Sequence, residues 1–498
     1  MSLDSELTQR TLGNFGMNGC SPVSDQAWYV IVRRLALISS LIFVIYFGVR
    51  VAYNLPSHLR CDWGVYYKAG EATRRHEPLY SLEWGPDMTF KYAPCVGLLM
   101  APFSLLPPVP ARVLWFFADV GLFLILLALC ARIQWPADRR PQLHSWPMLL
   151  AVLLSVKFLI DQWIAGQSTI LFLTLTVASF YCVQRELMLP AGALLAAAVC
   201  VKLVPVCFVP YFLLHRRGMI GILSFASSLA ALLMLPAAWH GWEANAALLS
   251  EWPRHLMATD IPVQAFRVNN QSVYAMMSRL LTVSDYGCNI AVWNLHDVRN
   301  LWLIVSVLAA GGLHLFLWNT RHDSSPHRAP TQLSLLLLFM TLFNPLAWGY
   351  NYVALLPTYL LLIETVRRPV RGQFWVLALF SIGFAMSSAE MGVTWLPILD
   401  TLQVWNLRCL GGFALVALVI WSYRAAAAIE VAAADRTNGF GGVSKYLQLG
   451  PIRSGSRGKS KISIIRAESD ERDIQRAHSA RHSSAEIIET SCRLDEGV

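Results

Sequence analysis

A repeated series of long apolar runs, separated by short polar segments, constrains this chain more than any other feature of its sequence. A helical membrane crossing needs ~20 predominantly apolar residues. The period-two alternation of a membrane β-barrel strand is not seen, so we expect the runs to cross as helices. They predict an all-α, polytopic helical bundle of about 12 transmembrane helices, centred on residues 30–51, 92–106, 111–131, 146–160, 169–182, 189–214, 220–236, 301–318, 333–343, 353–363, 374–386 and 410–421.

The placement of charge agrees with a membrane protein and argues against a nucleic-acid partner. Charged residues make up 14% of the chain and hydrophobic residues 55%, whereas about 25% of the residues in a soluble domain are charged. The net charge of +9 arises mainly from short basic clusters at the ends of apolar runs and in the C-terminal tail. Lys and Arg gather in this way on the cytoplasmic side of membrane proteins. We therefore expect that the chain binds no nucleic acid.

The same basic clusters predict the orientation of the bundle. The segments that we place in the cytoplasm are 216–217, 321–328, 367–371 and the tail. By alternation of the crossings, the segments that face outside are 54–91, 239–300 and 344–352. Segment 132–144 resists this scheme, because it carries Arg132, Arg139 and Arg140 and yet the alternation places it outside.

Composition divides the chain into three parts. We expect residues 1–29 to form a polar N-terminal cytoplasmic segment, 30–425 the transmembrane domain, and 435–498 a basic cytoplasmic tail. The tail is rich in Ser, Gly and Arg and poor in aromatic residues, so we expect disorder. Its basic stretch would attract anionic membrane lipids at ~1 kcal/mol per cation. A solvated tail that merely follows the charge rule is the alternative.

Signals for nucleotide and metal binding are missing. No Asp-x-Asp occurs, and Gly458-Lys459-Ser460 imitates the end of a P-loop although Arg453 stands where its first glycine is required. The ten cysteines are scattered and include no C-x-x-C pair. One bridge, between Cys61 and Cys288, could form on the outer side. We expect no metal and no cofactor, and if the chain is an enzyme, its donor substrate would be one already embedded in the membrane.

The most informative stretch is 61–72, which reads Cys-Asp-Trp-Gly-Val-Tyr-Tyr-Lys-Ala-Gly-Glu-Ala. It predicts a short amphipathic helix at the outer surface, with Asp62 at its start and Tyr66 one turn later. A carboxylate at that position caps the free N–H groups of the helix. It can instead act as a general base that takes the proton of an attacking sugar hydroxyl. The residues alone leave both roles open.

Taken together, several short motifs resemble glycosyltransferase family 87, a group of polyprenyl-phosphate-sugar-dependent enzymes with the GT-C fold. In that family an outer loop carries an Asp before Tyr-Tyr-x-Ala-Gly, followed by Pro-Leu-Tyr and by an aromatic-Tyr-Pro-Pro step. The resemblance covers residues 62–357, more than half of the chain. The corresponding pieces are Asp62 to Gly70, Pro78-Leu79-Tyr80, Phe90 to Pro94, Gly166-Gln167, Lys202 to Pro205 and Asn270-Gln271-Ser272.

The resemblance implies transfer of mannose, or a related sugar, from a polyprenyl-phosphate donor to a lipid-linked or glycan acceptor. The reaction would take place on the outer face of a bacterial plasma membrane. The resemblance also implies that Asp62 is the general base of an inverting mechanism without a required metal. The residues that we expect to bind substrate are Tyr66, Tyr67, Arg74, Lys91, Tyr92, Lys202, Arg267, Asn270, Gln271, Tyr350 and Asn351.

One motif departs from the family pattern. Where the family often reads Ser-Pro-x-Ser-Trp-x-His-His, this chain has Tyr350 and Asn351 in place of the two histidines. Their polarity survives, but a cationic contact to the donor phosphate is lost.

A second residue stands out for its position. Lys202 lies well inside an apolar run, where a charge is costly unless it faces a cavity or a partner. Three interpretations stay open: its side chain extends to the membrane interface, it contacts the donor phosphate, or it pairs with a carboxylate such as Asp161.

A transporter or flippase of a lipid-linked saccharide is the main alternative function, since it would share the helices, the basic tail and the aromatic outer loops. Such a transporter is expected to contain inverted repeats with broken helices, and no convincing repeat is seen. An acidic residue in a large outer loop favours the enzyme. A membrane scaffold would need neither that residue nor Lys202.

Overall fold

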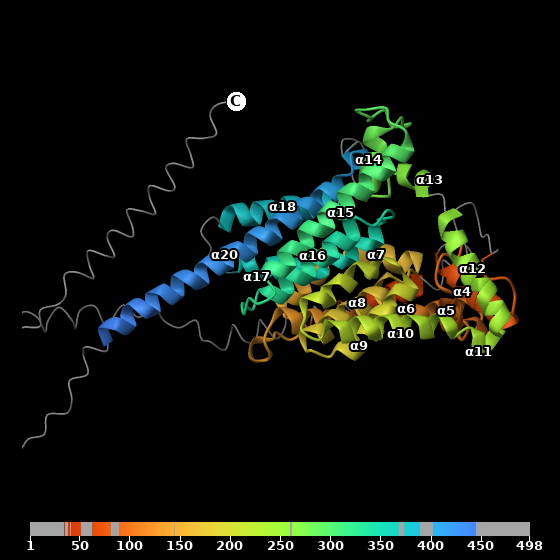
Figure 1. Cartoon of the computed structure of the whole chain (residues 1–498), viewed down its shortest axis with the longest axis horizontal. Helices are drawn as coiled ribbons and strands as arrows, with labels where there is room; N and C mark the ends of the chain where they lie inside the picture. Colours follow the sequence, from red (N-terminus) through yellow and green to blue (C-terminus); the bar gives the residue numbers. More distant parts are fainter. Residues whose placement is uncertain are drawn as a thin grey trace, which may run out of the picture. The chain divides into compact units, whose positions relative to one another are not determined.

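The computed structural model describes residues 34, 38–39, 41–50, 62–80, 89–143, 145–258, 261–367, 373–388 and 402–444. The chain divides into two units, Met1–Ala433 and Ala434–Val498, and the contacts discussed below all lie in the first. Within these ranges the chain is helical and no β-strand occurs (Figure 1). The helices that concern the site are α4 (Asp62–Arg75), α5 (Pro94–Met100), α6 (Pro108–Gln134), α7 (Trp146–Ala165), α8 (Thr169–Gln184), α9 (Met188–Val201), α10 (Gly218–Met234), α11 (Ala237–His240), α12 (Trp242–Ala258), α13 (Ile261–Phe266) and α14 (Val273–Leu281). Those that follow are α15 (Leu295–Asn319), α16 (Arg328–Leu342), α17 (Leu356–Val366), α18 (Gln373–Ser388) and α20 (Leu407–Ser444), and the short 3₁₀ helices are η1 (Phe103–Leu105), η2 (Ala137–Arg139), η3 (Val204–Leu214) and η4 (Gly349–Leu355).

The described helices are those of a membrane protein. Five stretches are long and apolar enough to cross a bilayer: Pro108–Gln134, Trp146–Ala165, Gly218–His240, Leu295–Asn319 and Leu407–Ala426. Only 6% of the most apolar stretch of α15 is buried inside the protein, and Val307 and Leu308 on it are each 69% exposed. So large an apolar face is rare on a soluble monomer and is typical of a surface that lipid covers. The predicted count of about 12 crossings is not confirmed, since the remaining apolar helices are short.

Two of the predicted crossings differ from the observed helices. Segment 92–106 contains only the seven residues of α5 and the three of η1. A seven-residue helix is about 10 Å long, against about 30 Å for the hydrocarbon core, so this segment does not cross as one helix. Segment 189–214 is split into α9 and η3 by an extended residue, Lys202. Pro205 and Pro210 keep η3 from continuing α9, because proline lacks the N–H that an α-helix requires.

The missing crossing at 92–106 removes the conflict over segment 132–144. The hydroxyl of Tyr67 on α4 donates to the carbonyl of Leu106 at 2.9 Å, so α6 starts beside α4. Arg112, near the start of α6, donates to the carbonyl of Ile164, at the end of α7. The two helices are therefore antiparallel, and the loop with Arg139 lies at the opposite end from α4.

The other basic loops lie at that same end. Arg367 stacks on Trp146, at the start of α7, with its guanidinium 5.0 Å from the ring centroid. Arg328 donates to Gln184, at the end of α8, at 3.4 Å. His215 faces Glu186 at 3.4 Å. Because α7 and α8 are joined by a short turn at Gly166 and Glu186 follows the end of α8, all three contacts lie at the end away from α4. The basic clusters therefore gather at one end of the bundle.

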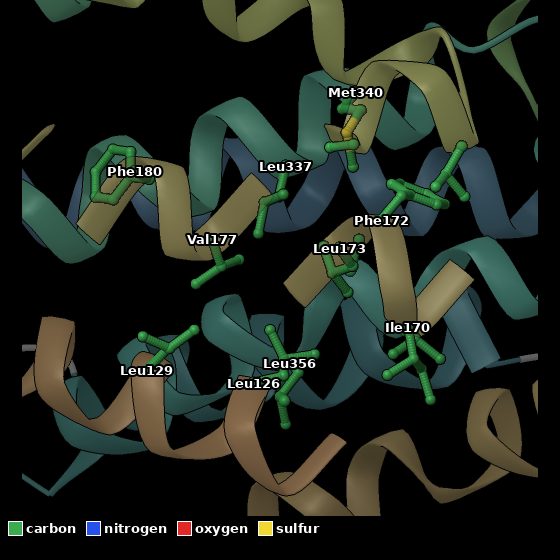
Figure 2. Packing of buried hydrophobic residues seen from close by; sticks show 14 of the residues in the cluster. Leu126, Leu129, Ile170, Phe172, Leu173, Val177, Phe180, Leu337, Met340 and Leu356 are labelled. Atoms are coloured by element: carbon green, nitrogen blue, oxygen red, sulfur yellow. The ribbon is translucent and has the colours of Figure 1, made fainter. Parts of the chain in front are cut away.

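The interior of the bundle is packed with aliphatic and aromatic side chains. Figure 2 shows Leu126 and Leu129 of α6 close to residues of α8 and α17. Most of the residues in this cluster are nearly inaccessible, with Val177, Leu337 and Leu356 all at 0% exposure. Close packing at this density holds the helix ends in fixed relative positions, which a site assembled from many helices requires.

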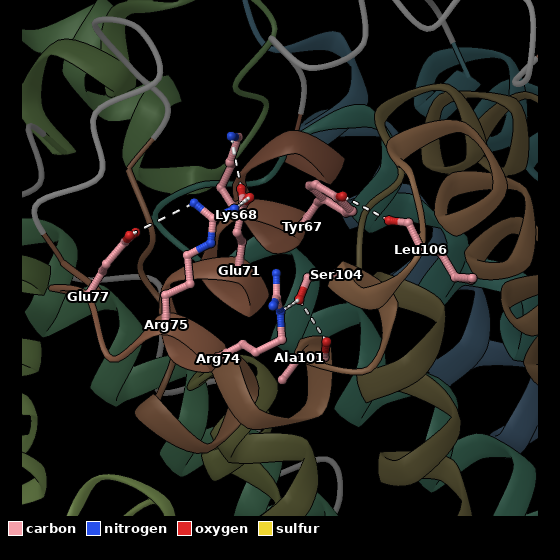
Figure 3. A network of polar contacts seen from close by, with 9 residues as sticks. All are labelled: Tyr67, Lys68, Glu71, Arg74, Arg75, Glu77, Ala101, Ser104 and Leu106. Carbon is pink, nitrogen blue, oxygen red and sulfur yellow. Dashed lines mark hydrogen bonds and ion pairs between the residues drawn. The ribbon is translucent and has the colours of Figure 1, made fainter.

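Helix α4 is amphipathic and packs against α5 and η1 (Figure 3). Its polar side carries Glu71, which pairs with Lys68 at 3.0 Å and with Arg75 at 2.7 Å. Gly70 allows the close approach, because a Cβ there would lie 2.4 Å from the carbonyl oxygen of Met100. These contacts fix the helix whose first residue is Asp62.

Parts of the predicted organisation fall outside the described residues. They are the N-terminal segment 1–29, residues 445–498 of the basic tail and Cys61 of the suggested bridge. The first ten residues of the predicted tail, 435–444, continue α20 as helix. Cys288 has a free thiol, which lies 3.6 Å from the carbonyl oxygen of Arg279.

Candidate active site

A cavity of about 550 Å³ opens at the end of the bundle opposite the basic loops. Its walls come from the start of α4, the segment before α5, the α7–α8 turn, the break between α9 and η3, helices α12 and α13, and the segment before η4. The predicted site residues that line it are Asp62, Lys91, Tyr92, Lys202, Arg267, Tyr350 and Asn351. Segments up to about 290 residues apart in the sequence therefore contribute to one site.

Five predicted site residues do not line the cavity. Tyr66 is fully buried behind Tyr92, with its hydroxyl 2.6 Å from the Tyr92 hydroxyl and 2.8 Å from that of Ser168. Tyr67, one residue on, points toward η1 and bonds the carbonyl of Leu106. Arg74 points in the same direction, with its Nε 3.4 Å from the Ser104 hydroxyl (Figure 3).

Asn270 and Gln271 are both fully buried and connect loops. The Asn270 amide donates to the carbonyl of Pro345 at 2.9 Å and accepts from the backbone N–H of Ala347 at 3.0 Å. Gln271 donates to the carbonyl of Gln403 at 2.9 Å. The backbone N–H of Gln271 also donates to the carbonyl of Ala347 at 2.9 Å. Both residues thus hold the segment before η4 in place and contribute to the site indirectly.

The environment of Asp62 sets its ionisation. Burial is the largest influence and raises the pKa of its carboxyl above the ordinary value. The Gln167 side chain opposes this rise, as do the positive charges of Lys202, Lys91 and Arg112, in that order. The carboxylate lies in the first turn of α4, where the helix dipole also favours a negative charge. The amide and the three cations reduce the rise in the pKa of Asp62 without cancelling it.

Gln167 was not among the predicted binding residues, although the Gly166-Gln167 motif was noted. Gly166 ends α7 in the left-handed conformation, with φ of 66°. Its neighbour Gln167 lines the cavity and donates to the Tyr350 hydroxyl at 3.2 Å. Its Oε1 atom lies 3.1 Å from the Tyr66 hydroxyl. One amide therefore connects the α7–α8 turn with α4 and η4.

Lys202 lies at the cavity wall, where the chain turns back between α9 and η3. Its ammonium group lies 3.4 Å from the Thr169 hydroxyl and 3.4 Å from Oδ1 of Asn351. It also lies 5.1 Å from the ring centroid of Tyr350 and 5.2 Å from that of Phe172. These contacts are typical of a cation held at a fixed position.

The alternative partner that the sequence suggested for Lys202 lies elsewhere. A Cβ at Gly349 would be 2.5 Å from Oδ2 of Asp161 and 2.9 Å from Nη1 of Arg408. Asp161 therefore lies beside Gly349 and Arg408. The residues that replace the two family histidines, Tyr350 and Asn351, are both in contact with Lys202.

The lining combines charge with aromatic and amide groups. Three cations, Lys91, Lys202 and Arg267, and one carboxylate, Asp62, line the cavity. Such a set suits one anionic phosphate group beside a neutral reactant whose proton is to be removed. The neutral lining residues that could contact a sugar are Thr89, Tyr92, Gln167, Trp252, Gln264, Asn344 and Trp348.

Known proteins share sequence with most of this chain. A polyprenol-phosphate-mannose-dependent alpha-(1-2)-phosphatidylinositol mannoside mannosyltransferase of Mycolicibacterium smegmatis is 24% identical over 440 residues, which cover 82% of this chain and 91% of that protein. A protein of the same description from Mycobacterium tuberculosis is 27% identical over 337 residues, covering 63% of this chain and 72% of that protein.

The sequence model of glycosyltransferase family 87 matches residues 90–345, just over half of the chain. Lys91, Tyr92, Lys202 and Arg267 lie inside that range, whereas Asp62 precedes it. Members of the family are enzymes, so a transporter or a scaffold is no longer needed to explain the cavity. The chain belongs to glycosyltransferase family 87 and is a membrane glycosyltransferase.

Proposed function

We propose that this protein transfers a mannosyl group from a polyprenyl-phosphate donor to a lipid-linked acceptor, and that Asp62 is the general base. The observation that carries the proposal is the joint presence of the Asp62 carboxylate and the Lys202 ammonium on the wall of one cavity. A donor of this class needs a cation for its phosphate, and an acceptor hydroxyl needs a proton acceptor. The two mycobacterial relatives are described as polyprenol-phosphate-mannose-dependent, which supports this donor.

In the proposed reaction an acceptor hydroxyl oxygen forms a bond to the anomeric carbon while the bond from that carbon to the phosphate oxygen breaks. The hydroxyl proton passes to Asp62. Polyprenyl phosphate leaves with the electron pair of the broken bond, and its charge is compensated by Lys202. Because attack and departure occur on opposite faces, a β-linked donor gives an α-linked product.

Lys202 takes over, in this proposal, the cationic role that Tyr350 and Asn351 cannot supply. Asn351 accepts from the ammonium group, and the ring of Tyr350 lies beside it. The charge at the phosphate is thus kept although the two histidines of the family pattern are absent. Such a site would retain its charge from pH 5 to 7, where histidine titrates.

We further propose that the cavity faces the outside of a bacterial plasma membrane. The basic loops lie at the opposite end of the bundle, and such loops remain in the cytoplasm. A polyprenyl-phosphate donor can be reached from that outer face, whereas a nucleotide sugar is a cytoplasmic compound. The names of the relatives suggest a phosphatidylinositol mannoside as the first acceptor to test, with an α-(1-2) linkage as the expected product.

The test uses the purified full-length protein in detergent with polyprenyl-phosphate mannose and phosphatidylinositol mannosides, and mass spectrometry of the lipid products. We expect a product heavier by one hexose, formed equally well in the presence of EDTA. A parallel reaction with GDP-mannose replaces the lipid donor. Formation of product from GDP-mannose alone would contradict the proposal. So would the absence of product when the lipid donor is offered with each of the mannosylated lipid acceptors.

A further inference from the structure

A buried arginine lies directly beside the cavity without lining it. Arg112 belongs to α6, within a predicted membrane crossing, and is only 1% exposed. Its Nη2 group donates to the carbonyls of Trp163 and Ile164, the latter at 3.2 Å. These carbonyls belong to the last turn of α7, where an α-helix leaves such groups without helical partners. Arg112 thus closes the end of α7 at the point where the chain turns toward Gln167.

Two features of the structure require a glycine at position 166 in that turn. Gly166 has a φ of 66°, which disfavours other residues. A Cβ at the same position would also lie 2.2 Å from Nη1 of Arg112 and 2.5 Å from its Cζ. The turn and the guanidinium are therefore in direct contact, and only a residue without a Cβ fits between them.

The same guanidinium reaches the helix that carries Asp62. Its Cζ lies 5.6 Å from the ring centroid of Trp63, which is fully buried. A guanidinium at this distance is attracted to the face of the indole ring, by more than at an exposed site because water is excluded. Trp63 also packs against Trp115, one turn further along α6 from Arg112, with ring centroids 5.9 Å apart.

A second contact holds the turn from the other side. The side-chain amide of Gln162 on α7 donates to the carbonyl of Gln167 and lies 3.4 Å from Oδ2 of Asp119. Gln162 and Asp119 are buried and, like Arg112, do not line the cavity. The three side chains form a polar layer beneath the α7–α8 turn.

We infer that Arg112 is a positioning residue for sugar transfer, which holds the Gly166–Gln167 turn against the first turn of α4 so that the Gln167 amide meets the Asp62 carboxylate. The inference rests on the proposed role of Asp62 as the base. Substrate does not touch Arg112, since Arg112 lies behind the cavity wall. Its effect on the reaction passes through the groups that it orients.

Arg112 also acts on the base through its charge. It is one of the three cations that lower the pKa of Asp62, with Lys202 and Lys91. The uncharged hydroxyls of Tyr66, Tyr92 and Tyr350 lie near the same carboxyl group. Loss of the Arg112 charge therefore raises the pKa of Asp62. Because the base must be ionised, the acid limb of the rate profile moves to higher pH.

The test compares Arg112→Gln, Arg112→Lys and Gly166→Ala with Arg185→Gln as the matched control. Arg185 is at the far end of α8, where it lies 5.4 Å from the Tyr181 ring. For Arg112→Gln we expect kcat to fall by roughly 10–100-fold, with little change in the KM for donor and with the acid limb moved upward. Arg112→Lys restores the position of the acid limb but little of kcat, because an ammonium cannot reproduce the planar fork. Arg185→Gln keeps wild-type values.

Folding is monitored by size exclusion and thermal unfolding. If Arg112→Gln is not monodisperse, Arg112→Lys and Gly166→Ala carry the test, and each should lower kcat by at least about tenfold. Wild-type kcat with an unmoved acid limb in the folded variants would overturn the inference. Asp62→Asn is measured in parallel: if it too is fully active, the proposed base fails, whereas an inactive Asp62→Asn beside normal Arg112 variants refutes the positioning role alone.

Discussion

Replacement of Asp62 by Asn separates a catalytic carboxylate from a helix cap. Asn has nearly the same size and is an equally good N-cap residue, and even replacement of a cap by Ala costs only about 1 kcal/mol. We therefore expect Asp62→Asn to fold and to unfold within a few degrees of the wild type. Loss of a general base lowers the rate by about 10²–10⁴-fold, or about 2.7–5.4 kcal/mol of transition-state stabilisation.

The charges around Asp62 predict how kcat and KM divide. In the wild type its carboxylate faces Lys202 and Lys91. An Asn at this position leaves those cations without that opposing charge, so a phosphate should bind as tightly as before or more tightly. The loss is therefore expected in kcat, with a donor KM that is unchanged or lower. A variant damaged by misfolding would show a raised KM or a lost monodisperse peak.

The control is Glu71→Gln on the same helix. Glu71 pairs with Lys68 and Arg75 on the polar side of α4 and does not line the cavity. Because ion pairs at a protein surface contribute about 0–1 kcal/mol and Glu71 is only half-buried, this variant should transfer at nearly the wild-type rate. The assay is hexose transfer from polyprenyl-phosphate mannose, followed by mass spectrometry between pH 4 and 8. Near wild-type turnover by Asp62→Asn would refute the reasoning and leave Asp62 as a cap.

Three further predictions follow from the structure. Lys202→Met should raise the KM for the lipid donor by at least about tenfold, since a buried charge-assisted contact contributes about 1.5–3 kcal/mol. Titration of the variant with polyprenyl phosphate measures the loss of affinity, and an unchanged affinity would contradict the prediction. An impermeant thiol reagent should label Thr89→Cys but not Arg139→Cys in intact cells, and the reverse pattern would invert the proposed orientation. Arg279 is fully buried and donates to the carbonyls of Val404, Ala265, Arg267 and Asn270. Its replacement by Met should therefore lower the free energy of unfolding by about 3 kcal/mol or more. An unchanged unfolding temperature would show that these hydrogen bonds contribute little to stability.

Local physical chemistry made several features readable from the sequence. The apolar runs predicted a membrane protein, because helices with so many exposed apolar side chains are stable only in the hydrocarbon core of a bilayer. The pattern around Asp62 predicted an amphipathic helix, and α4 begins at that residue. Lys202 was marked by its cost inside an apolar run, and it lies on the cavity wall. The same rule applied to Arg112, which is buried within α6, would have singled it out as well.

Other features could not be read locally. Adjacent residues on a helix point about 100° apart, so the sequence could not say that Tyr66 faces the cavity wall and Tyr67 faces η1. Asn270 and Gln271 are polar and buried, which suits a binding site and a scaffold equally well. Segment 92–106 is apolar enough for a crossing, and only the contact of Tyr67 with Leu106 shows on which side it ends.

The sequence by itself determined the class of the protein and the chemical types available to the site, since these depend on composition and short-range periodicity. The tertiary structure alone decided which of the polar residues meet. Asp62, Lys202 and Asn351 follow one another in the chain at intervals of about 140–150 residues. They line one cavity because the packing of many helices fixes where each helix ends. The spatial distances between these side chains are therefore a property of the whole bundle, which no local segment encodes.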